Sequence, residues 1–249
     1  MGLFKDKVAV VTGASRGIGR AIVRMLAQEG CQVAFNYHQS DAAAAAFQDE
    51  LQKVGHKVKA SRVDIKDFAE VRAWIEETRN HFGRIDILVN NAGIIVDKAL
   101  MLMSQEDWDV VLSTNLDGYF HAARACIVTF LKQKSGDIVN ISSVSGSMGL
   151  PRQVNYSAAK GGVNAFTKAL AKEVAAYGVR VNAVAPGYID TEILSGFNEE
   201  QRAKIIESIP LNHLGTPQDV VNCVRFLLSP SAQYITGQVI TVDGGLTMR

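Results

Sequence analysis

The sequence predicts an α/β fold: a single doubly wound (Rossmann) domain of about seven parallel strands with helices on both faces. Three observations favour it. Short β-rich runs alternate with longer helical stretches along the 249 residues, the order produced by parallel strands joined by right-handed crossovers. The first of these runs, Val8 to Thr12, is apolar without alternation, as in a strand covered on both faces. No repeat, linker or composition shift divides the chain, so we expect one domain over residues 1–249.

The first half of the chain supplies four of these strand–helix units. Short β-rich runs predict strands at residues 8–12, 32–36, 57–63 and 85–89. The first helix presents Ile18, Ile22 and Leu26 at helical spacing and ends at Gly30, a residue type that suits the position after a helix. An Ala-rich helix follows Asp41, and a third helix is expected over residues 67–82.

The second half continues the pattern with longer helices. Ser104 and Asp107 resemble a capping box at the start of one helix. Strands are predicted at residues 138–141, 179–184 and 239–242, with a helix over 155–177 between the first two. Thr216 and Pro217 predict the start of the last helix. Residues 188–214 are the least regular and suggest a mobile helical lid.

Composition excludes several classes of function. The chain carries 26 Lys and Arg against 25 Asp and Glu, so it has no net basic field to hold nucleic acid or anionic lipid. No apolar run approaches the ~18 residues of a membrane span. The three cysteines, Cys31, Cys126 and Cys223, are widely spaced and are interpreted as buried apolar residues. Neither they nor the five scattered histidines form a metal-ligand spacing. We expect a cytoplasmic enzyme without a metal.

A glycine-rich turn follows the first predicted strand and opens the first helix. It reads Thr12-Gly-Ala-Ser-Arg-Gly-Ile-Gly19, with glycines at 13, 17 and 19. Glycine lets the backbone turn sharply and lets a pyrophosphate approach the N–H groups of a helix N-terminus. The alternative is a tight turn that binds nothing. The strand–turn–helix context favours a dinucleotide site.

The order of motifs resembles the short-chain dehydrogenase/reductase family over essentially the whole chain. Besides the glycine turn, Asn90-Asn-Ala-Gly93 follows the fourth strand, Pro186-Gly187 follows the sixth, and Thr191 lies beyond. The resemblance implies a catalytic set at the family's spacings: Asn115, Ser143, Tyr156 and Lys160. It also implies NAD(H) or NADP(H), with cofactor contacts from residues in every motif. We assign these contacts to Gly13, Ser15, Arg16, Gly17, Ile18, Gly19, Asn36, Asp64, Asn90, Ala92, Gly93, Tyr156, Lys160, Pro186, Gly187, Ile189 and Thr191.

Within the family the chain is most similar to the 3-oxoacyl-[acyl-carrier-protein] reductases. The similarity lies in Gln153-Val-Asn-Tyr156, Ser157-Ala-Ala-Lys160, Val181-Asn-Ala-Val-Ala-Pro-Gly187 and Val242-Asp-Gly-Gly245. It implies NADPH-dependent reduction of a 3-oxoacyl thioester held by acyl carrier protein, in fatty-acid or polyketide synthesis, by a homotetramer. One departure is Gly149-Leu-Pro-Arg152, where these reductases usually carry a Gly- and Asn-rich turn.

The predicted chemistry depends on Tyr156 and Lys160, which lie one turn apart on a helix. An ordinary tyrosine has a pKa near ~10 and is a poor acid–base catalyst. A nearby ammonium is expected to lower the pKa of Tyr156 and make it a general acid for reduction. The alternative is a surface tyrosine beside a solvated lysine.

Two further catalytic candidates have alternative structural interpretations. Ser143 closes the fifth strand, where its hydroxyl can hydrogen-bond the substrate carbonyl, or it can cap the next segment. Ser142 alternates to the other face. The resemblance assigns Asn115 a backbone-bound water that relays protons to Lys160; otherwise Asn115 marks an exposed helix kink.

Asp64, a predicted cofactor contact, also has an alternative structural interpretation. The resemblance assigns Asp64 to the adenine amino group. The alternative for Asp64 is an N-cap, a role that Asp67 can also fill.

The residues also predict NADPH rather than NADH. NAD-specific domains place an acid at the end of the second strand to hold the ribose 2′-hydroxyl, but this strand ends Phe35-Asn36-Tyr37. Asn36 can donate a hydrogen bond to a 2′-phosphate, and Arg16 can meet it with a charge-assisted one. Asp41 is the nearest acid and is interpreted as an N-cap; if it reached the ribose, NADH would be favoured.

Two other functions remain open from the sequence: another alcohol, sugar or ketone dehydrogenase on the same scaffold, and a catalytically silent nucleotide-binding protein. The intact catalytic set argues against the second. Oligomer contacts are expected on the helix after Asn155, through Ala158, Ala159, Gly162, Ala165 and Phe166. Carrier docking is expected on local cations: Arg124, Lys132, Lys134, Lys168 and Lys172.

Overall fold

The protein is built on one seven-stranded parallel sheet. The computed structural model describes residues 2–192 and 196–248. The strands are β1 (Val8–Val11), β2 (Gln32–Tyr37), β3 (Val58–Arg62), β4 (Ile87–Asn90), β5 (Gly136–Ile141), β6 (Val179–Pro186) and β7 (Val239–Val242). Their order in the sheet is β3-β2-β1-β4-β5-β6-β7, and every pairing is parallel. The predicted fold class and the number of strands are confirmed.

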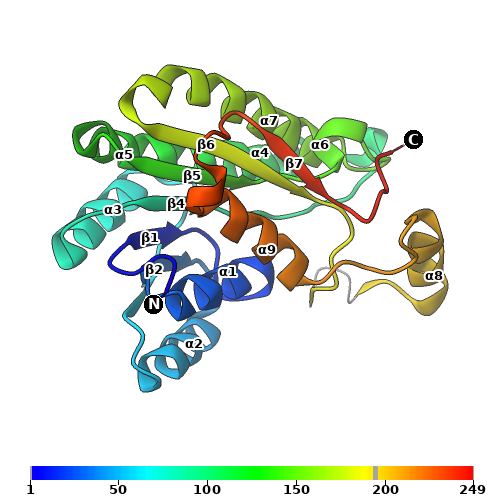
Figure 1. Ribbon diagram of the computed structural model, residues 1–249. Helices are drawn as coiled ribbons and strands as arrows, with labels where there is room; N and C mark the ends of the chain where they lie inside the picture. Colours follow the sequence, from blue (N-terminus) through cyan, green and yellow to red (C-terminus); the bar gives the residue numbers. More distant parts are fainter. Residues whose placement is uncertain (1, 193–195, 249) are drawn as a thin grey trace.

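Helices cover both faces of this sheet (Figure 1). One face is covered by α1 (Gly17–Gln28), α2 (Asp41–Lys53) and α9 (Pro217–Leu228), whose buried apolar residues pack on those of the strands. The other face is covered by α3 (Phe68–Phe82), α5 (Gly118–Gln133) and α7 (Val154–Val174). Two apolar cores therefore sandwich the sheet, which is why central strands such as β1 and β4 are buried on both sides, whereas the edge strands β3 and β7 are only partly buried.

Shorter elements complete the chain. They are the 3₁₀ turns η1 (Leu100–Leu102), η3 (Ala175–Tyr177) and η5 (Pro230–Ala232), the helices α4 (Gln105–Leu112), α6 (Ser145–Met148) and α8 (Glu199–Ser208), and the π-helical turn η2 (Ser113–Asp117). Sequence reasoning missed α6 and the π turn, because neither is long enough to show a periodic pattern.

Most helix signals in the sequence are confirmed. Ser104 and Asp107 form a reciprocal capping box on α4, and Thr216 caps α9 with Pro217 in its first turn. Gly30 follows α1 with a φ of 86°. Asp67 is the N-cap of α3. The N-cap assignment of Asp41 is wrong: the N-cap of α2 is Ser40, and Asp41 is the first helical residue.

The predicted lid contains a helix, α8, which stands apart from the sheet in Figure 1. Asn198 and Gln201 form its capping box, and α8 contributes no buried residue. Residues 193–195 of the predicted lid lie outside the described residues. Mobility of this segment stays a prediction.

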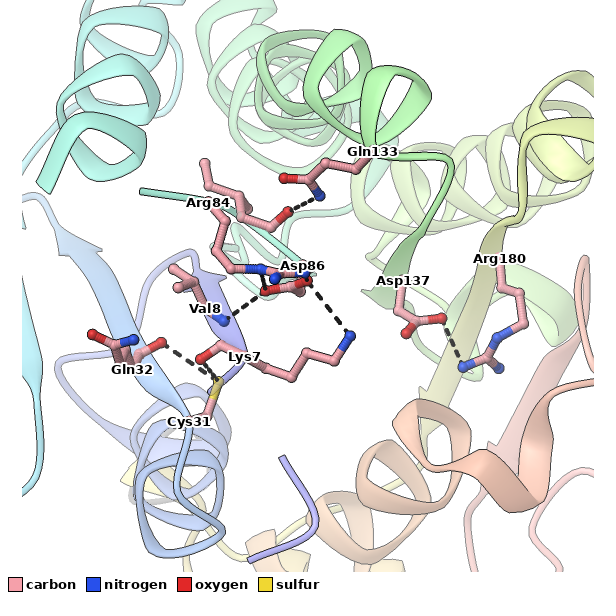
Figure 2. Close-up of polar contacts among 10 residues, drawn as sticks. Lys7, Val8, Cys31, Gln32, Arg84, Asp86, Gln133, Asp137 and Arg180 are labelled. Atoms are coloured by element: carbon pink, nitrogen blue, oxygen red, sulfur yellow. Dashed lines mark hydrogen bonds and ion pairs between the residues drawn. The ribbon is translucent and has the colours of Figure 1, made fainter. Parts of the chain in front are cut away.

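The amino ends of the central strands meet a cluster of charged side chains (Figure 2). Asp86 is 2% exposed, and its carboxylate accepts hydrogen bonds from Val8 N–H at 2.9 Å and Arg84 Nε at 2.8 Å. Lys7 lies 3.5 Å from the same carboxylate. Asp86 therefore joins β1 to the segment that enters β4.

A second ion pair joins the next strands. Asp137 of β5 lies 2.6 Å from the guanidinium of Arg180 in β6. Arg180 also donates to the carbonyls of Leu227 and Ala232, both at 2.8 Å. These contacts thus connect the amino ends of β5 and β6 to the carboxyl end of α9 and the turn that follows it.

The three cysteines do not share one environment. Cys31 and Cys126 are buried, as expected, and burial raises the pKa of the Cys126 thiol to about 12. Cys223 is only partly buried, so the expectation for it was wrong. Cys223 packs against the apolar core on the face covered by α1, α2 and α9 without being enclosed by it.

No helix within the described residues has the length and hydropathy to span a membrane.

Candidate active site and cofactor site

The glycine turn is held against the carboxyl end of β4 by side chains that sequence reasoning did not single out. The hydroxyl of Thr12 accepts hydrogen bonds from the N–H groups of Asn91 at 2.9 Å and Ala92 at 3.0 Å. The amide of Asn91 donates back to the carbonyls of Thr12 and Gly13. Both residues belong to the two quoted motifs, so the signal was present. The turn and the Asn-Asn-Ala-Gly segment form one rigid unit at the point where strand order reverses, the position of ligand crevices in such sheets.

Two glycines of the turn are required by close packing. A Cβ on Gly13 would lie 2.6 Å from the Cα of Ala92, and a Cβ on Gly19 would lie 2.4 Å from the Asn91 amide nitrogen. Gly13 also has a φ of 65°. No L side chain fits at Gly13 or Gly19 without moving the backbone. The turn therefore has no side chain at these positions, and its surface is shallow.

The N-terminus of α1 differs from the capped helices around it. Its N-cap residue, Arg16, makes no capping hydrogen bond through its side chain, and its first turn has no acid. Arg16 is exposed, whereas Ser15, Gly17 and Ile18 are half-buried. The helix's own side chains therefore leave its first N–H groups uncapped, which suits an anionic ligand.

The segment after β6 lies over this turn. The N–H of Gly187 donates to Val242 O at 2.9 Å, and a Cβ on Gly187 would meet Asp243 at 2.7 Å. Pro186 and Ile189 are buried. A methyl carbon of Thr191 lies 3.9 Å from where a Cβ of Gly17 would stand. The structure thus brings the predicted Pro-Gly segment and the glycine turn together.

Asn36 is placed differently from its prediction. It is 2% exposed; its Oδ1 accepts from Gly13 N–H at 2.9 Å and its Nδ2 donates to Val63 O at 2.9 Å. The amide that was expected to donate to a 2′-phosphate is used inside the protein. That part of the NADPH argument was wrong, because a buried amide needs its hydrogen bonds satisfied internally.

Asn90 also points into the protein. Its amide donates to Asn140 Oδ1 at 2.9 Å, and Asn140 donates to the hydroxyl of Thr167 at 2.9 Å. This buried chain links β4, β5 and α7. A direct role for the Asn90 side chain at the cofactor surface is therefore not supported. Gly93, in contrast, lies against Asn115: a Cβ on Gly93 would stand only 2.9 Å from Asn115 Oδ1.

Asp64 lies beyond β3, half-buried, and accepts a hydrogen bond from Lys66 N–H at 3.0 Å. It lines a surface cleft of about 590 Å³ together with His38, Ser61, Arg62, Val63, Glu70, Ala73, Trp74 and Glu77. None of the four predicted catalytic residues lines this cleft. The adenine contact of Asp64 stays a prediction.

Lys160 is buried at the centre of the predicted catalytic set. Its Nζ donates to the Tyr119 hydroxyl at 2.9 Å and to Ile141 O at 2.7 Å. It also lies 5.7 Å from the ring centre of Tyr156. Burial lowers the pKa of Lys160 to about 7. Sequence reasoning missed Tyr119, which follows Asn115 by one helical turn.

Tyr156 is half-buried and shares a hydrogen bond with Ser143. Burial raises the pKa of Tyr156 to about 12, the hydrogen bond from Ser143 opposes this, and the charge of Asp97 adds to it. The prediction that the Lys160 ammonium lowers this pKa was wrong for this arrangement, because the Lys160 amine is directed to Tyr119 and Ile141. The phenol therefore keeps its proton at neutral pH, the state that a general acid needs.

The two serines that follow β5 both reach residues of α7, so these contacts do not place them on opposite faces as predicted. Ser143 Oγ accepts from Ser145 N–H at 3.1 Å and reaches Tyr156. Ser142 is buried and donates to Asn164 Oδ1 at 2.6 Å. Ser143 therefore accepts a hydrogen bond from the following turn and also contacts Tyr156, and its catalytic role stays a prediction.

Asn115 lies in the π-helical turn between α4 and α5. It is fully buried; its Oδ1 accepts from Ile94 N–H and its Nδ2 donates to Ile94 O, both at 2.8 Å. The alternative of an exposed helix kink is therefore wrong, because Asn115 is buried within a π-helical turn. Isolated π turns are frequent at functional sites, and this one ties the segment after β4 to the helix that carries Tyr119. The water relay stays a prediction.

Comparison with known proteins identifies relatives across almost the whole chain. A family described as Enoyl-(Acyl carrier protein) reductase matches residues 13–247. The chain is 49% identical over 243 residues to a Synechocystis protein named 3-oxoacyl-[acyl-carrier-protein] reductase, with 97% of each chain covered. It is 46% identical over 242 residues to 3-oxoacyl-[acyl-carrier-protein] reductase FabG of Staphylococcus aureus strain Mu50, covering 97% of this chain and 98% of the relative. A Chlamydia muridarum protein of the same name is 42% identical over 244 residues, with 98% of each covered.

Proposed function

Because the chain belongs to the short-chain dehydrogenase/reductase family, we propose that it uses NADPH to reduce a 3-oxoacyl thioester to the 3-hydroxyacyl thioester. The observation that carries the proposal is the buried Lys160 beside a protonated Tyr156 that shares a hydrogen bond with Ser143. The names of the relatives support the keto group as the reacting centre.

The residues present fit a nicotinamide dinucleotide. The close-packed glycines of the turn provide the shallow surface, and the uncapped start of α1 provides N–H groups for a diphosphate. Among the described residues, Lys160 and Tyr156 are the groups that would meet the nicotinamide ribose and the keto oxygen. When bound, the cofactor supplies the hydride that the keto carbon accepts.

The chain's own groups then act on the oxygen. Ser143 donates a hydrogen bond to the keto oxygen as negative charge develops. Tyr156 donates its proton to the same oxygen, giving the alcohol. Lys160 holds Tyr119 and the β5 backbone in place and, with water at Asn115, returns a proton to Tyr156.

A direct assay tests this function. Recombinant protein with NADPH should reduce a short 3-oxoacyl thioester and leave the corresponding 2-enoyl thioester unchanged, followed by the loss of NADPH absorbance. Reduction of the enoyl thioester instead would support the reaction that the matched family's description names. Turnover of simple ketones or sugars alone would favour the other dehydrogenases.

We further propose NADPH as the preferred cofactor, on the exposed Arg16 and the absence of a carboxylate at residues 35–37. Asp41 pairs with Arg62 at 4.0 Å rather than standing free for a ribose. A charge-assisted hydrogen bond contributes ~1.5–3 kcal/mol, so Arg16→Ala should weaken NADPH binding about ten- to a hundredfold. NADH binding should barely change. Fluorescence titration of both cofactors measures this, with Arg79→Ala, an exposed arginine of α3, as the control; tighter NADH binding by the wild type would contradict it.

The homotetramer is a further proposal. The residues of α7 that were expected to contact another subunit differ in exposure. Ala158 and Ala165 are exposed, whereas Ala159 is buried and Gly162 packs on Leu116. On α5, Phe120 and Val128 are about half exposed. These apolar surfaces suit subunit contacts. Light scattering should give about four times the 27.0 kDa of one chain, and a mass near that of one chain would exclude the assembly.

Acyl carrier protein is the proposed carrier of the thioester, and the cytoplasm the proposed location. All five predicted docking cations are exposed. Helices α5 and α7, however, run from the carboxyl ends of the strands, where the proposed catalytic residues lie, toward the amino ends. At 1.5 Å per residue, Lys172 lies about 24 Å along α7 from Tyr156. Lys132, Lys134 and Lys172 are therefore poorly placed for a carrier whose thioester must reach Tyr156. Arg124 and Lys168 are nearer.

A further inference from the structure

Arg152 has an unusual backbone conformation beside the proposed active site. Its φ is 67°, in the left-handed region that side chains larger than Asn or Asp seldom adopt. Among the described residues, Asp6, Lys134 and Asn212 are the other non-glycine positions with positive φ. Arg152 alone of these lies next to the helix turn that carries Tyr156. Strained residues of this kind persist where the surrounding structure fixes them, and they cluster at ligand sites.

Contacts on both sides fix this conformation. The carbonyl of Arg152 accepts a hydrogen bond from Lys98 N–H at 2.9 Å, from the segment that follows β4. The next residue, Gln153, is the N-cap of α7. Its side chain donates to Asp97 at 3.2 Å and accepts from Ser145 at 2.9 Å. The backbone of Arg152 is thus held between the walls of the catalytic site.

The side chain of Arg152 is exposed, and within residues 2–192 and 196–248 it takes part in no hydrogen bond or ion pair. Among the neighbouring charges, Lys98 pairs with Asp107 at 2.7 Å. The Asp97 carboxylate accepts one hydrogen bond at 3.2 Å from the uncharged amide of Gln153. A glycine would relieve the backbone at this position, so an arginine there places an unneutralised guanidinium at the rim of the site at some cost in stability.

We propose that Arg152 binds an anionic group of the substrate, a phosphate or a carboxylate remote from the keto group, and so contributes to substrate selection. The guanidinium fork matches both groups in bidentate fashion. The inference rests on the proposed function, because it takes the thioester as the substrate. A phosphate would come from the carrier arm of the thioester, and a carboxylate from the far end of the acyl chain.

Binding measurements on the protein saturated with NADP⁺ test the proposal without requiring turnover. One ligand pair is phosphopantetheine and pantetheine, which differ in the phosphate. The other is 3-hydroxyglutaryl-pantetheine and its methyl ester, which differ in the carboxylate. The variants are Arg152→Gly, Arg152→Lys and the control Lys172→Ala, which removes an exposed cation far along α7.

The wild type should bind the anionic member of one pair about tenfold tighter or more. Arg152→Gly should lose that preference, Arg152→Lys should keep part of it, and Lys172→Ala should keep it all. If Arg152→Gly loses the preference for phosphopantetheine over pantetheine, Arg152 binds the phosphate of the carrier arm. If it loses the preference for the free carboxylate over the methyl ester, Arg152 binds the end of the acyl chain. Arg152→Gly should unfold at the same or a higher temperature, since glycine adopts positive φ freely.

Equal preferences in the wild type and Arg152→Gly for both pairs would overturn the proposal, as would no preference in the wild type. Failure of the proposed function has a different signature. In that case the wild type with NADPH would not reduce 3-oxobutyryl-pantetheine, whereas the binding preferences would still show whether Arg152 recognises an anion.

Discussion

Tyr156→Phe is expected to lower the turnover of the 3-oxoacyl thioester by about 10²–10⁴-fold, the range of a lost general acid. The substitution removes only the hydroxyl that shares a hydrogen bond with Ser143. The ring remains beside Lys160, whose own hydrogen bonds go to Tyr119 and Ile141. NADPH affinity and the unfolding temperature should therefore stay close to those of the wild type.

Single-turnover and steady-state assays measure this effect, with Tyr177→Phe as the control. Tyr177 is about half exposed at the far end of the same helical region, so its hydroxyl should contribute nothing to turnover. Wild-type turnover in Tyr156→Phe would remove the tyrosine from the mechanism. A fall in NADPH affinity as large as the fall in turnover would instead indicate a binding role.

Lys160→Met should have two separable effects. Turnover should fall at least tenfold and NADPH should bind about tenfold more weakly, because the hydrogen-bond donor proposed to meet the ribose is lost. The second effect concerns stability. Burial lowers the pKa of Lys160 from 10.5 to about 7, so between these pH values the unfolded chain binds more protons than the folded protein.

The free energy of unfolding of the wild type should therefore rise from about pH 7 to about pH 10 through this group. Lys160→Met lacks the group, so its stability relative to the wild type should decline across the same range. Urea unfolding at several pH values measures the difference, and Lys168→Met, on the exposed side of the same helix, should show no such trend. Parallel pH curves for the wild type and Lys160→Met would show that Lys160 is not held with a depressed pKa.

The order of strands and helices was predictable because it depends on local patterns. Fully apolar runs identify strands buried on both faces, and capping residues such as Ser104 and Thr216 identify helix starts. Short elements were not predictable. The π turn at Asn115 and the four residues of α6 carry no periodicity, so only the packed chain shows them.

The candidate catalytic residues were named from motifs, but their interactions could not be predicted in this way. Spacing along a helix placed Lys160 near Tyr156, yet it cannot show that the amine turns to Tyr119 and Ile141. Asn36 illustrates the same limit: the end of β2 was predicted correctly, but the direction of its amide depends on Gly13 and Val63 from other parts of the chain. Contacts distant in sequence decide such details.

The ion pairs of Figure 2 have an evolutionary consequence. Asp86 and Asp137 secure the strand ends opposite those that carry Ser143 and the glycine turn. Substitution of a partner of buried Asp86 leaves a charge or an N–H group unsatisfied, which lowers the free energy of unfolding by roughly 1–3 kcal/mol. Variation at these strand ends therefore changes the amount of folded protein. Variation at the other strand ends, near Ser143 and the glycine turn, is expected to change binding and activity instead. Substitutions in the loops at those other ends, such as the loop containing Arg152, should therefore leave the ion pairs of Asp86 and Asp137 intact.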